Sequence, residues 1–244
     1  MVSKHVGEKW IAEMEADSRL TAIRTEVEKA YTVSVGFAKG PEWEAQVKGR
    51  TAVIRIAETG RPLSSFAHEL LHLRLSARGY RHILAGGNID DQKRLQLIEV
   101  LVALDNELQH HRMFPDFIEA GFNGSEFYAE SDDRAFIALR KQIKALKLRV
   151  SPSAAFLIYL TLIGPGGCWP DGKREDLLKR LQEAVSAEVW TKLEKTKAII
   201  EDWKHRDSLD PASTIVEILK TLGDLGGSMV GDDIETIMQT GAYI

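Results

Sequence analysis

The spacing of apolar positions predicts a short β-containing region near the N-terminus and helices over most of the remaining chain. Residues 31–38 and 51–58 alternate with a period of two and are rich in β-branched side chains, which predicts two strands. Apolar residues recur every three or four positions in the segments expected to be helical, namely 8–30, 64–78, 91–114, 135–150, 152–162, 174–206 and 212–222. The pattern therefore predicts an α+β fold that is mainly α, with a small sheet packed on one of the helices.

The segment 64–78 is the predicted helix with the clearest boundaries. Ser64 or Ser65 can cap its start after the turn Gly60-Arg61-Pro62, and Gly79 can end it. Its apolar residues at positions i, i + 4 and i + 7, which we expect to face the core, are Phe66, Leu70 and Leu73.

This helix carries the pentapeptide His68-Glu69-Leu70-Leu71-His72, an H-E-x-x-H pattern. Residues four apart lie one turn above one another, so His68 and His72 can direct ring nitrogens at one divalent cation. Glu69 lies beside them and can act as the general base on a metal-activated water. The alternative is a surface helix with incidental histidines. Because the chain has only seven histidines and two of them fall at this spacing, the pattern favours a Zn²⁺ site.

The segment 91–114 is expected to be a deeply buried helix, because apolar residues occupy nearly every side of it. Leu95, Ile98 and Val102 lie along one stripe of this helix, with further leucines beside them. Pro115 is expected to disrupt or end the helix, since proline lacks the backbone N–H that the next turn requires.

Polar residues in the second half of this apolar helix are the candidates for a third zinc ligand, because a buried charge needs a partner or a metal. Glu107 is the first choice, which gives two histidines, a glutamate and a water. His110 is the main alternative, in a site of three histidines, and Glu99 is the second alternative. His111 is expected to hydrogen-bond a ligand or to stabilise the oxyanion of the tetrahedral intermediate, as a second catalytic residue.

Two other segments contain residues with metal-binding chemistry. Tyr80 and His82 are expected in a loop at the far end of the H-E-x-x-H helix, where they are not ligands. Cys168 lies in a glycine-rich loop and can in principle reach the metal as a thiolate. A loop cysteine packed beside Trp169 is the interpretation that we favour.

The strand predicted at 51–58 ends about ten residues before His68. We expect it to be an edge strand that pairs with an extended substrate and holds the scissile bond over the metal. A small sheet that only covers the helix is compatible with the same residues.

Composition and charge narrow the class of protein. The 244 residues are 44% apolar and 28% charged, with a net charge of −4, so nucleic acid is not expected to be bound directly. A basic run at 140–149 is interpreted as a solvated helix face. No apolar run has the length of a signal core or a membrane span, and one cysteine cannot build a disulfide framework. These features predict a cytoplasmic protein without membrane partners.

The turn-forming sequence Ser151-Pro152-Ser153 suggests a boundary near residue 150. We expect a metallopeptidase domain at 1–150 and a helical C-terminal region at 151–244, which either stands alone or belongs to the first domain.

The order of predicted elements, with two strands before the H-E-x-x-H helix and an acidic residue on a later helix, resembles the ImmA/IrrE-type zinc metallopeptidase domain over residues 8–120. The resemblance implies a compact zincin-like core. It implies that His68 and His72 are the ligand pair and that Glu69 is the general base. The later glutamate ligand would be Glu107 or Glu99. Residues 106–115 (NELQHHRMFP) depart from the Glu-x-x-Ala-x-x-Phe-Ala pattern that is usual in this family.

The first residues of that departing segment, Asn106-Glu107, are similar to the Asn-Glu that carries the third ligand in thermolysin-like enzymes. The ImmA/IrrE resemblance implies an intracellular protein that cleaves a helix-turn-helix repressor or an antitoxin. The functional hypothesis is therefore a zinc metallopeptidase that acts on a protein or peptide substrate. The alternatives are a non-catalytic regulatory protein with a structural zinc site and a zinc hydrolase of a non-peptide substrate.

Overall fold

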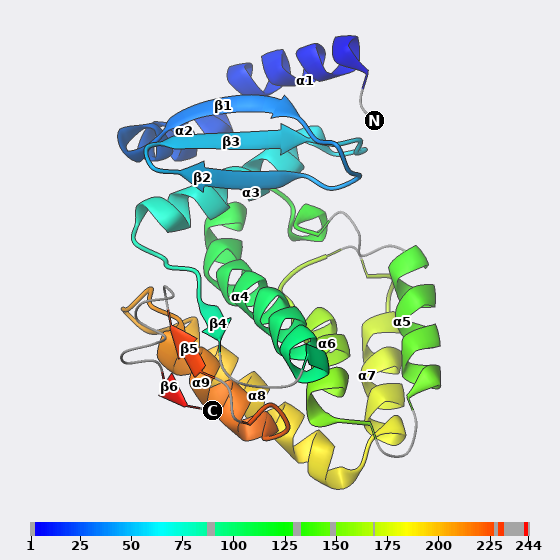
Figure 1. Ribbon diagram of the computed structural model, residues 1–244. Coiled ribbons are helices and arrows are strands. Elements are labelled where there is room, and N and C mark those ends of the chain that lie inside the picture. Colours follow the sequence, from blue (N-terminus) through cyan, green and yellow to red (C-terminus); the bar gives the residue numbers. More distant parts are fainter. Residues whose placement is uncertain are drawn as a thin grey trace. The chain divides into compact units, whose positions relative to one another are not determined.

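The computed structural model describes residues 3–86, 91–128, 133–146, 150–167, 169–226, 229–231 and 242–243 (Figure 1). Its helices are α1 (Lys4–Ala16), α2 (Ser18–Ala30), α3 (Pro62–Ala77), α4 (Asp91–Glu119), α5 (Asp133–Ala145), α6 (Pro152–Ile163), α7 (Lys173–Ala184), α8 (Ala187–Trp203) and α9 (Ala212–Leu222), with a short 3-10 helix η1 (Gly124–Glu126). Its strands are β1 (Thr32–Phe37), β2 (Glu44–Lys48), β3 (Thr51–Ile56), β4 (Leu84–Gly86), β5 (Met229–Gly231) and β6 (Ala242–Tyr243). The predicted α+β, mainly α fold is confirmed.

The chain divides into two compact units that are assembled from separated segments. The first unit contains residues 1–79, 112–130 and 165–168, and the second contains 80–111, 131–164 and 169–244. Helix α4 contributes to both, since it passes from the second unit into the first at Arg112. The domain boundary predicted near residue 150 stays a prediction.

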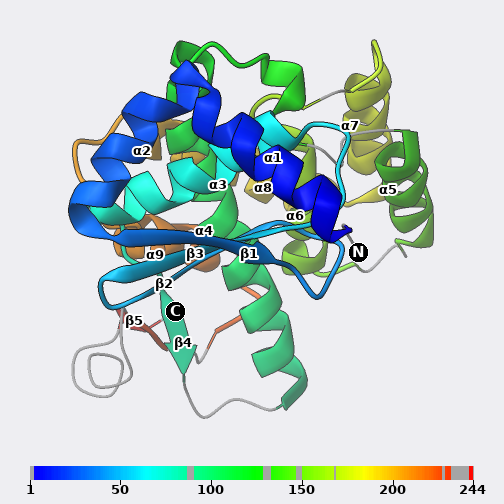
Figure 2. The ribbon, with the colours of Figure 1, turned by 90° about the horizontal axis from the view of Figure 1, so that it is seen from above.

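The first unit contains a three-stranded sheet in the order β1-β3-β2. β3 is parallel to β1 and antiparallel to β2. Alternate β3 side chains, Ala52, Ile54 and Ile56, are buried. Helices α1, α2 and α3 lie on one side of the sheet (Figure 2). The period-two pattern therefore predicted β1 and β3 correctly.

Strand β2 was not predicted, because its sequence EAQVK has only two apolar residues and four of its five positions are exposed. Its presence changes the role available to β3. The expectation that 51–58 forms an edge strand is wrong, because both edges of β3 are hydrogen-bonded to neighbouring strands. Among the described residues, β1 and β2 are the outer strands of this sheet.

Helix α3 begins with Pro62 at its first turn, where the missing N–H costs no helical hydrogen bond. The N-cap is Arg61, without a side-chain cap, so the expected capping role of Ser64 or Ser65 is wrong. The helix ends at Ala77, and Gly79 has the left-handed φ of 103° just beyond it, as the sequence predicts. Its three predicted core residues, Phe66, Leu70 and Leu73, are buried.

Of the two expectations for Pro115, that it ends the helix is wrong, because α4 continues through Pro115 to Glu119. Proline removes one hydrogen bond, from its own nitrogen to the carbonyl of His111. Met113 and Phe117 lie on either side of the proline and are almost fully buried. Burial of these apolar side chains offsets the lost hydrogen bond.

The N-terminal half of α4 is not buried on every side, which corrects a second expectation for this helix. Leu95, Ile98 and Val102 are 68%, 47% and 66% exposed. The opposite face, which carries Leu97, Val100, Leu101 and Leu104, is buried. The helix is amphipathic in its packing although its sequence is apolar on both faces.

The second unit is built mainly from helices, with close pairs formed by α8 and α9, by α5 and α7, and by α6 and α8. Trp203 at the end of α8 is fully buried, and its indole N–H donates to the carbonyl oxygen of Leu108 at 3.2 Å. Strand β4, which falls in a segment expected to be a loop, pairs antiparallel with β5. Within the described part of the chain, no helix combines the length and apolarity needed to cross a bilayer.

The two faces of α4 allow a matched test of this packing. Val100→Ala removes buried methyl groups and should lower the free energy of unfolding by about 1–3 kcal/mol. Val102→Ala makes the same chemical change at an exposed site and should shift it by at most about 0.5 kcal/mol. Urea unfolding of both variants measures the difference, and equal effects would contradict the burial pattern of α4.

Candidate metal centre

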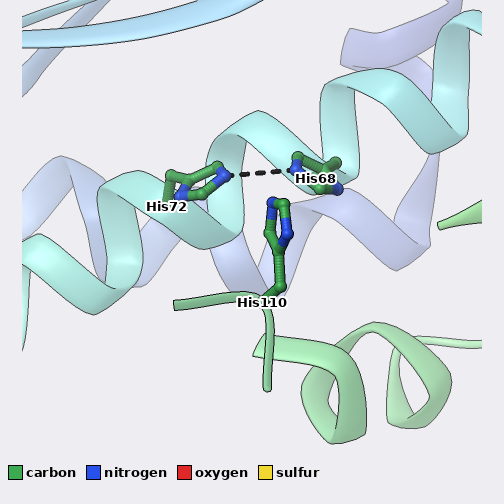
Figure 3. A group of neighbouring side chains, drawn as sticks. All are labelled: His68, His72 and His110. Carbon is green, nitrogen blue, oxygen red and sulfur yellow. Dashed lines mark hydrogen bonds between the residues drawn. The ribbon is translucent and has the colours of Figure 1, made fainter. Parts of the chain in front are cut away.

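The two histidines of the H-E-x-x-H pattern face each other on consecutive turns of α3. Their Nε2 atoms lie 3.1 Å apart, and their ring centroids are 4.9 Å apart (Figure 3). Two imidazole nitrogens bound to one tetrahedral zinc ion at about 2.0–2.1 Å would lie about 3.3 Å from each other. The distance between the Nε2 atoms of His68 and His72 is therefore close to the nitrogen–nitrogen distance in a tetrahedral zinc site.

A backbone carbonyl fixes the orientation of His68. Its Nδ1 lies 3.1 Å from the carbonyl oxygen of Phe127. Because a carbonyl can only accept, Nδ1 carries the proton and Nε2 is left with a lone pair. The Phe127 ring also packs on the imidazole, with centroids 4.7 Å apart. This is the orientation in which a histidine binds a metal through Nε2.

His110 completes a group of three imidazoles. One nitrogen from each of His68, His72 and His110 lies within 4.8 Å of the others. The ring of His110 points from α4 toward the α3 pair (Figure 3). His110 is buried, and it stands two residues before α4 enters the first unit at Arg112. Three imidazoles at this spacing form a donor set that suits zinc.

Glu107, the first choice for the third ligand, is not a member of this group. Its Oε2 lies 3.2 Å from Nδ1 of His110, one turn along α4, and both side chains are buried. A carboxylate that accepts from Nδ1 of a histidine directs Nε2 outward as a ligand. Glu99, the other acidic candidate, is exposed on α4 and does not belong to the group either.

Glu69 and His111, the two residues assigned catalytic roles from the sequence, are both buried. Glu69 follows His68 directly on α3. The Nε2 atom of His111 has no hydrogen-bond partner among the described residues, and burial lowers the pKa of this imidazole, which keeps it neutral near pH 7. His111 is not one of the three grouped histidines. Both catalytic roles stay predictions.

Asp105 shows how a buried carboxylate on α4 is satisfied without a metal. It accepts hydrogen bonds from the Tyr80 hydroxyl at 2.8 Å, from His82 Nδ1 at 2.7 Å and from Gln109 Nε2 at 3.1 Å. The bond to Asp105 raises the pKa of His82, and burial raises the pKa of the Tyr80 phenol. Sequence reasoning missed this pairing, although it placed Tyr80 and His82 in irregular chain before β4.

The expectations for Cys168 fall outside the described residues. Its neighbour Trp169 is described, and the Arg174 guanidinium lies over the Trp169 ring at 5.3 Å from the centroid.

Comparison of the chain with protein-family models, with curated proteins and with solved structures finds no match. The three histidines and the residues around them are therefore the features of the chain that indicate a function.

The His82–Asp105 pair predicts a dependence of stability on pH. Because the pKa of His82 is higher in the folded than in the unfolded state, its contribution is complete below the unfolded value and is lost as the pH rises through the folded value. The free energy of unfolding of the native protein should exceed that of His82→Gln by about 0.2–1 kcal/mol at acidic pH, because solvent screens the pair at the largely exposed His82 side chain.

This difference should shrink between about pH 6 and about pH 8.5, where a free imidazole is neutral. Urea unfolding of both proteins at the two pH values measures it. A difference that stays constant, or that grows as the pH rises, would show that the charge of His82 does not stabilise the fold.

Proposed function

We propose that this chain is a zinc-dependent metallopeptidase in which His68, His72 and His110 hold the ion. The observation that supports it most directly is the 3.1 Å separation of the His68 and His72 Nε2 atoms, with a nitrogen of His110 within 4.8 Å. The acceptors at Nδ1 of His68 and of His110 add to the fit, because they direct Nε2 of both rings toward a common point.

The number of ligands favours a catalytic over a structural site. Structural zinc sites are closed by four protein ligands, whereas catalytic sites use three and keep one position for water or substrate. Among the described residues, the group has three members. When bound, Zn²⁺ would lower the pKa of a water molecule and polarise a peptide carbonyl.

Glu69 is the residue that we assign to proton transfer. It lies between the two α3 ligands in sequence, and burial shields its carboxylate from bulk water. In the proposed reaction, Glu69 takes a proton from the attacking water and gives it to the amine that leaves as the peptide C–N bond breaks. His111 remains the candidate for stabilising the oxyanion.

The sheet offers an edge for an extended substrate. β2 is an outer strand among the described residues, and it packs against α3. A peptide that pairs with the free edge of β2 would run beside the H-E-x-x-H helix, which is the role first expected of 51–58. The resemblance to ImmA/IrrE-type metallopeptidases supports a zincin-like core and suggests a helix-turn-helix regulator or antitoxin as substrate.

The choice of third ligand can be tested through zinc content. His110→Ala should lose stoichiometric zinc, because it removes a ligand. Glu107→Ala should keep zinc with affinity reduced about 10–100-fold, since it removes the acceptor at Nδ1 of His110 and leaves the three imidazoles in place. Glu99→Ala, at an exposed position, should bind zinc like the unmodified protein.

The measurement is metal analysis after reconstitution with zinc and gel filtration. Loss of zinc in Glu107→Ala together with retention in His110→Ala would assign the third ligand to Glu107. A fully zinc-free native protein would refute the metal site itself.

The role of Glu69 can be separated from that of the ligands. Glu69→Gln preserves the size of a buried side chain but removes the base, so it should retain zinc and lose about 10²–10⁴-fold in hydrolysis rate. Cleavage of unfolded casein, followed by mass spectrometry of the fragments, supplies the readout, and the exposed Glu99→Gln is the matched control. Undiminished cleavage by Glu69→Gln would exclude the general-base role.

A further inference from the structure

The segment 124–127 supplies the carbonyl that orients His68, and α3 holds this segment at three consecutive residues. The three contacts come from one face of α3, at the spacing i, i + 3 and i + 7 from its N-cap. They are Arg61 Nη1 to the carbonyl oxygen of Ser125 at 3.0 Å, Ser64 Oγ to Oε2 of Glu126 at 2.6 Å, and His68 Nδ1 to the carbonyl oxygen of Phe127 at 3.1 Å.

A glycine-rich loop contacts the same segment. The N–H of Gly167 donates to the carbonyl oxygen of Gly124 at 2.9 Å. Gly166 has a left-handed φ of 72°, and a Cβ atom there would lie 2.5 Å from the Phe114 ring and 2.6 Å from the Gly124 carbonyl oxygen. Only glycine fits this position, for its backbone conformation and for its close approach to the segment.

Two aromatic rings, those of Phe114 and Phe127, connect the loop to the ligand His68. Phe114, which a side chain at position 166 would strike, packs edge-on against Phe127 with centroids 5.2 Å apart. Phe127 in turn packs on the ring of His68 and offers it the carbonyl acceptor. A displacement of the loop would therefore move the Phe127 carbonyl, which holds the proton of His68 on Nδ1.

We propose that the loop at residues 165–167 is a positioning element for the metal ligand His68, with Gly166 as its positioning residue. The proposal rests on the proposed metal site and identifies the loop that keeps the His68 ring in the orientation needed to bind the ion. Both the loop and α3 hydrogen-bond to residues 124–127, so the acceptor at Nδ1 of His68 is fixed before a metal arrives. Metal binding then does not have to order the His68 side chain, so no conformational entropy is lost at this residue.

Two glycine variants test this proposal against simple loss of stability. Gly166→Ala combines a left-handed backbone with a collision, whereas Gly172→Ala has a matching φ of 70° and no atom within 4 Å of the new Cβ. We expect Gly166→Ala to weaken zinc binding by about 10–100-fold and Gly172→Ala to leave it unchanged. Competition with a chelator, well below the unfolding temperature, measures the affinity.

The visible spectrum of the Co²⁺-substituted protein gives a second readout, because it reports the geometry of the ligands. It should change in Gly166→Ala and remain as in the unmodified protein in Gly172→Ala. Loss of thermal stability with unaltered zinc affinity and an unaltered Co²⁺ spectrum would overturn the positioning role.

A second pair of variants decides the question if Gly166→Ala does not fold. Glu126→Ala removes the acceptor of the Ser64 hydrogen bond, while Glu126→Gln retains an oxygen that can accept it. Glu126→Ala should lower zinc affinity, and Glu126→Gln should restore it. Equal affinity in both Glu126 variants and the unmodified protein would overturn the proposal while leaving the metal site intact. Failure of the unmodified protein to bind zinc would instead refute the proposed function.

Discussion

Hydrogen bonding at Nδ1 is the interaction on which the candidate metal centre depends. A histidine can rotate about two side-chain bonds and can carry its proton on either nitrogen, so two histidines four residues apart do not by themselves form a cation site. The Phe127 carbonyl removes this freedom from His68, and the Glu107 carboxylate removes it from His110. Both acceptors leave Nε2 with its lone pair, and two different structural elements thus prepare ligands of the same kind.

Helix α4 shows why the surroundings of a buried carboxylate, rather than its burial, decide its role. Asp105 and Glu107 are both buried, and each is paired with an imidazole Nδ1. The partner of Asp105 is the largely exposed His82, so this pair joins irregular chain to the helix. The partner of Glu107 is the buried His110, whose ring faces two further imidazoles. Similar pairs therefore serve one structural contact and one candidate metal centre.

The parts of the fold and site that could be predicted from the sequence are those fixed by local spacing. The period of two in β1 and β3, the buried stripe of α3 and the facing pair His68 and His72 follow from helix and strand geometry alone. β2 could not be predicted, because its place is fixed by pairing with β3 and not by its own pattern. Two features of α4 depend on what packs against that helix, namely the pairing of Glu107 with His110 and the exposed stripe. They could not be predicted, because the helix is apolar on both faces and its sequence does not indicate which face is buried.

The contact between Phe127 and His68 explains why the hydrogen-bond acceptor of His68 cannot be recognised in the sequence. Its contribution is a backbone oxygen, which every residue has, so nothing about a phenylalanine at 127 indicates that His68 needs it. The position of this oxygen instead constrains which residues are allowed where another backbone segment approaches it closely. Gly166 meets the Gly124 carbonyl where no side chain would fit, about 100 residues after the H-E-x-x-H pattern. Gly166 is therefore the residue in the sequence whose type is constrained by the contacts that orient His68, although the two residues are far apart along the chain.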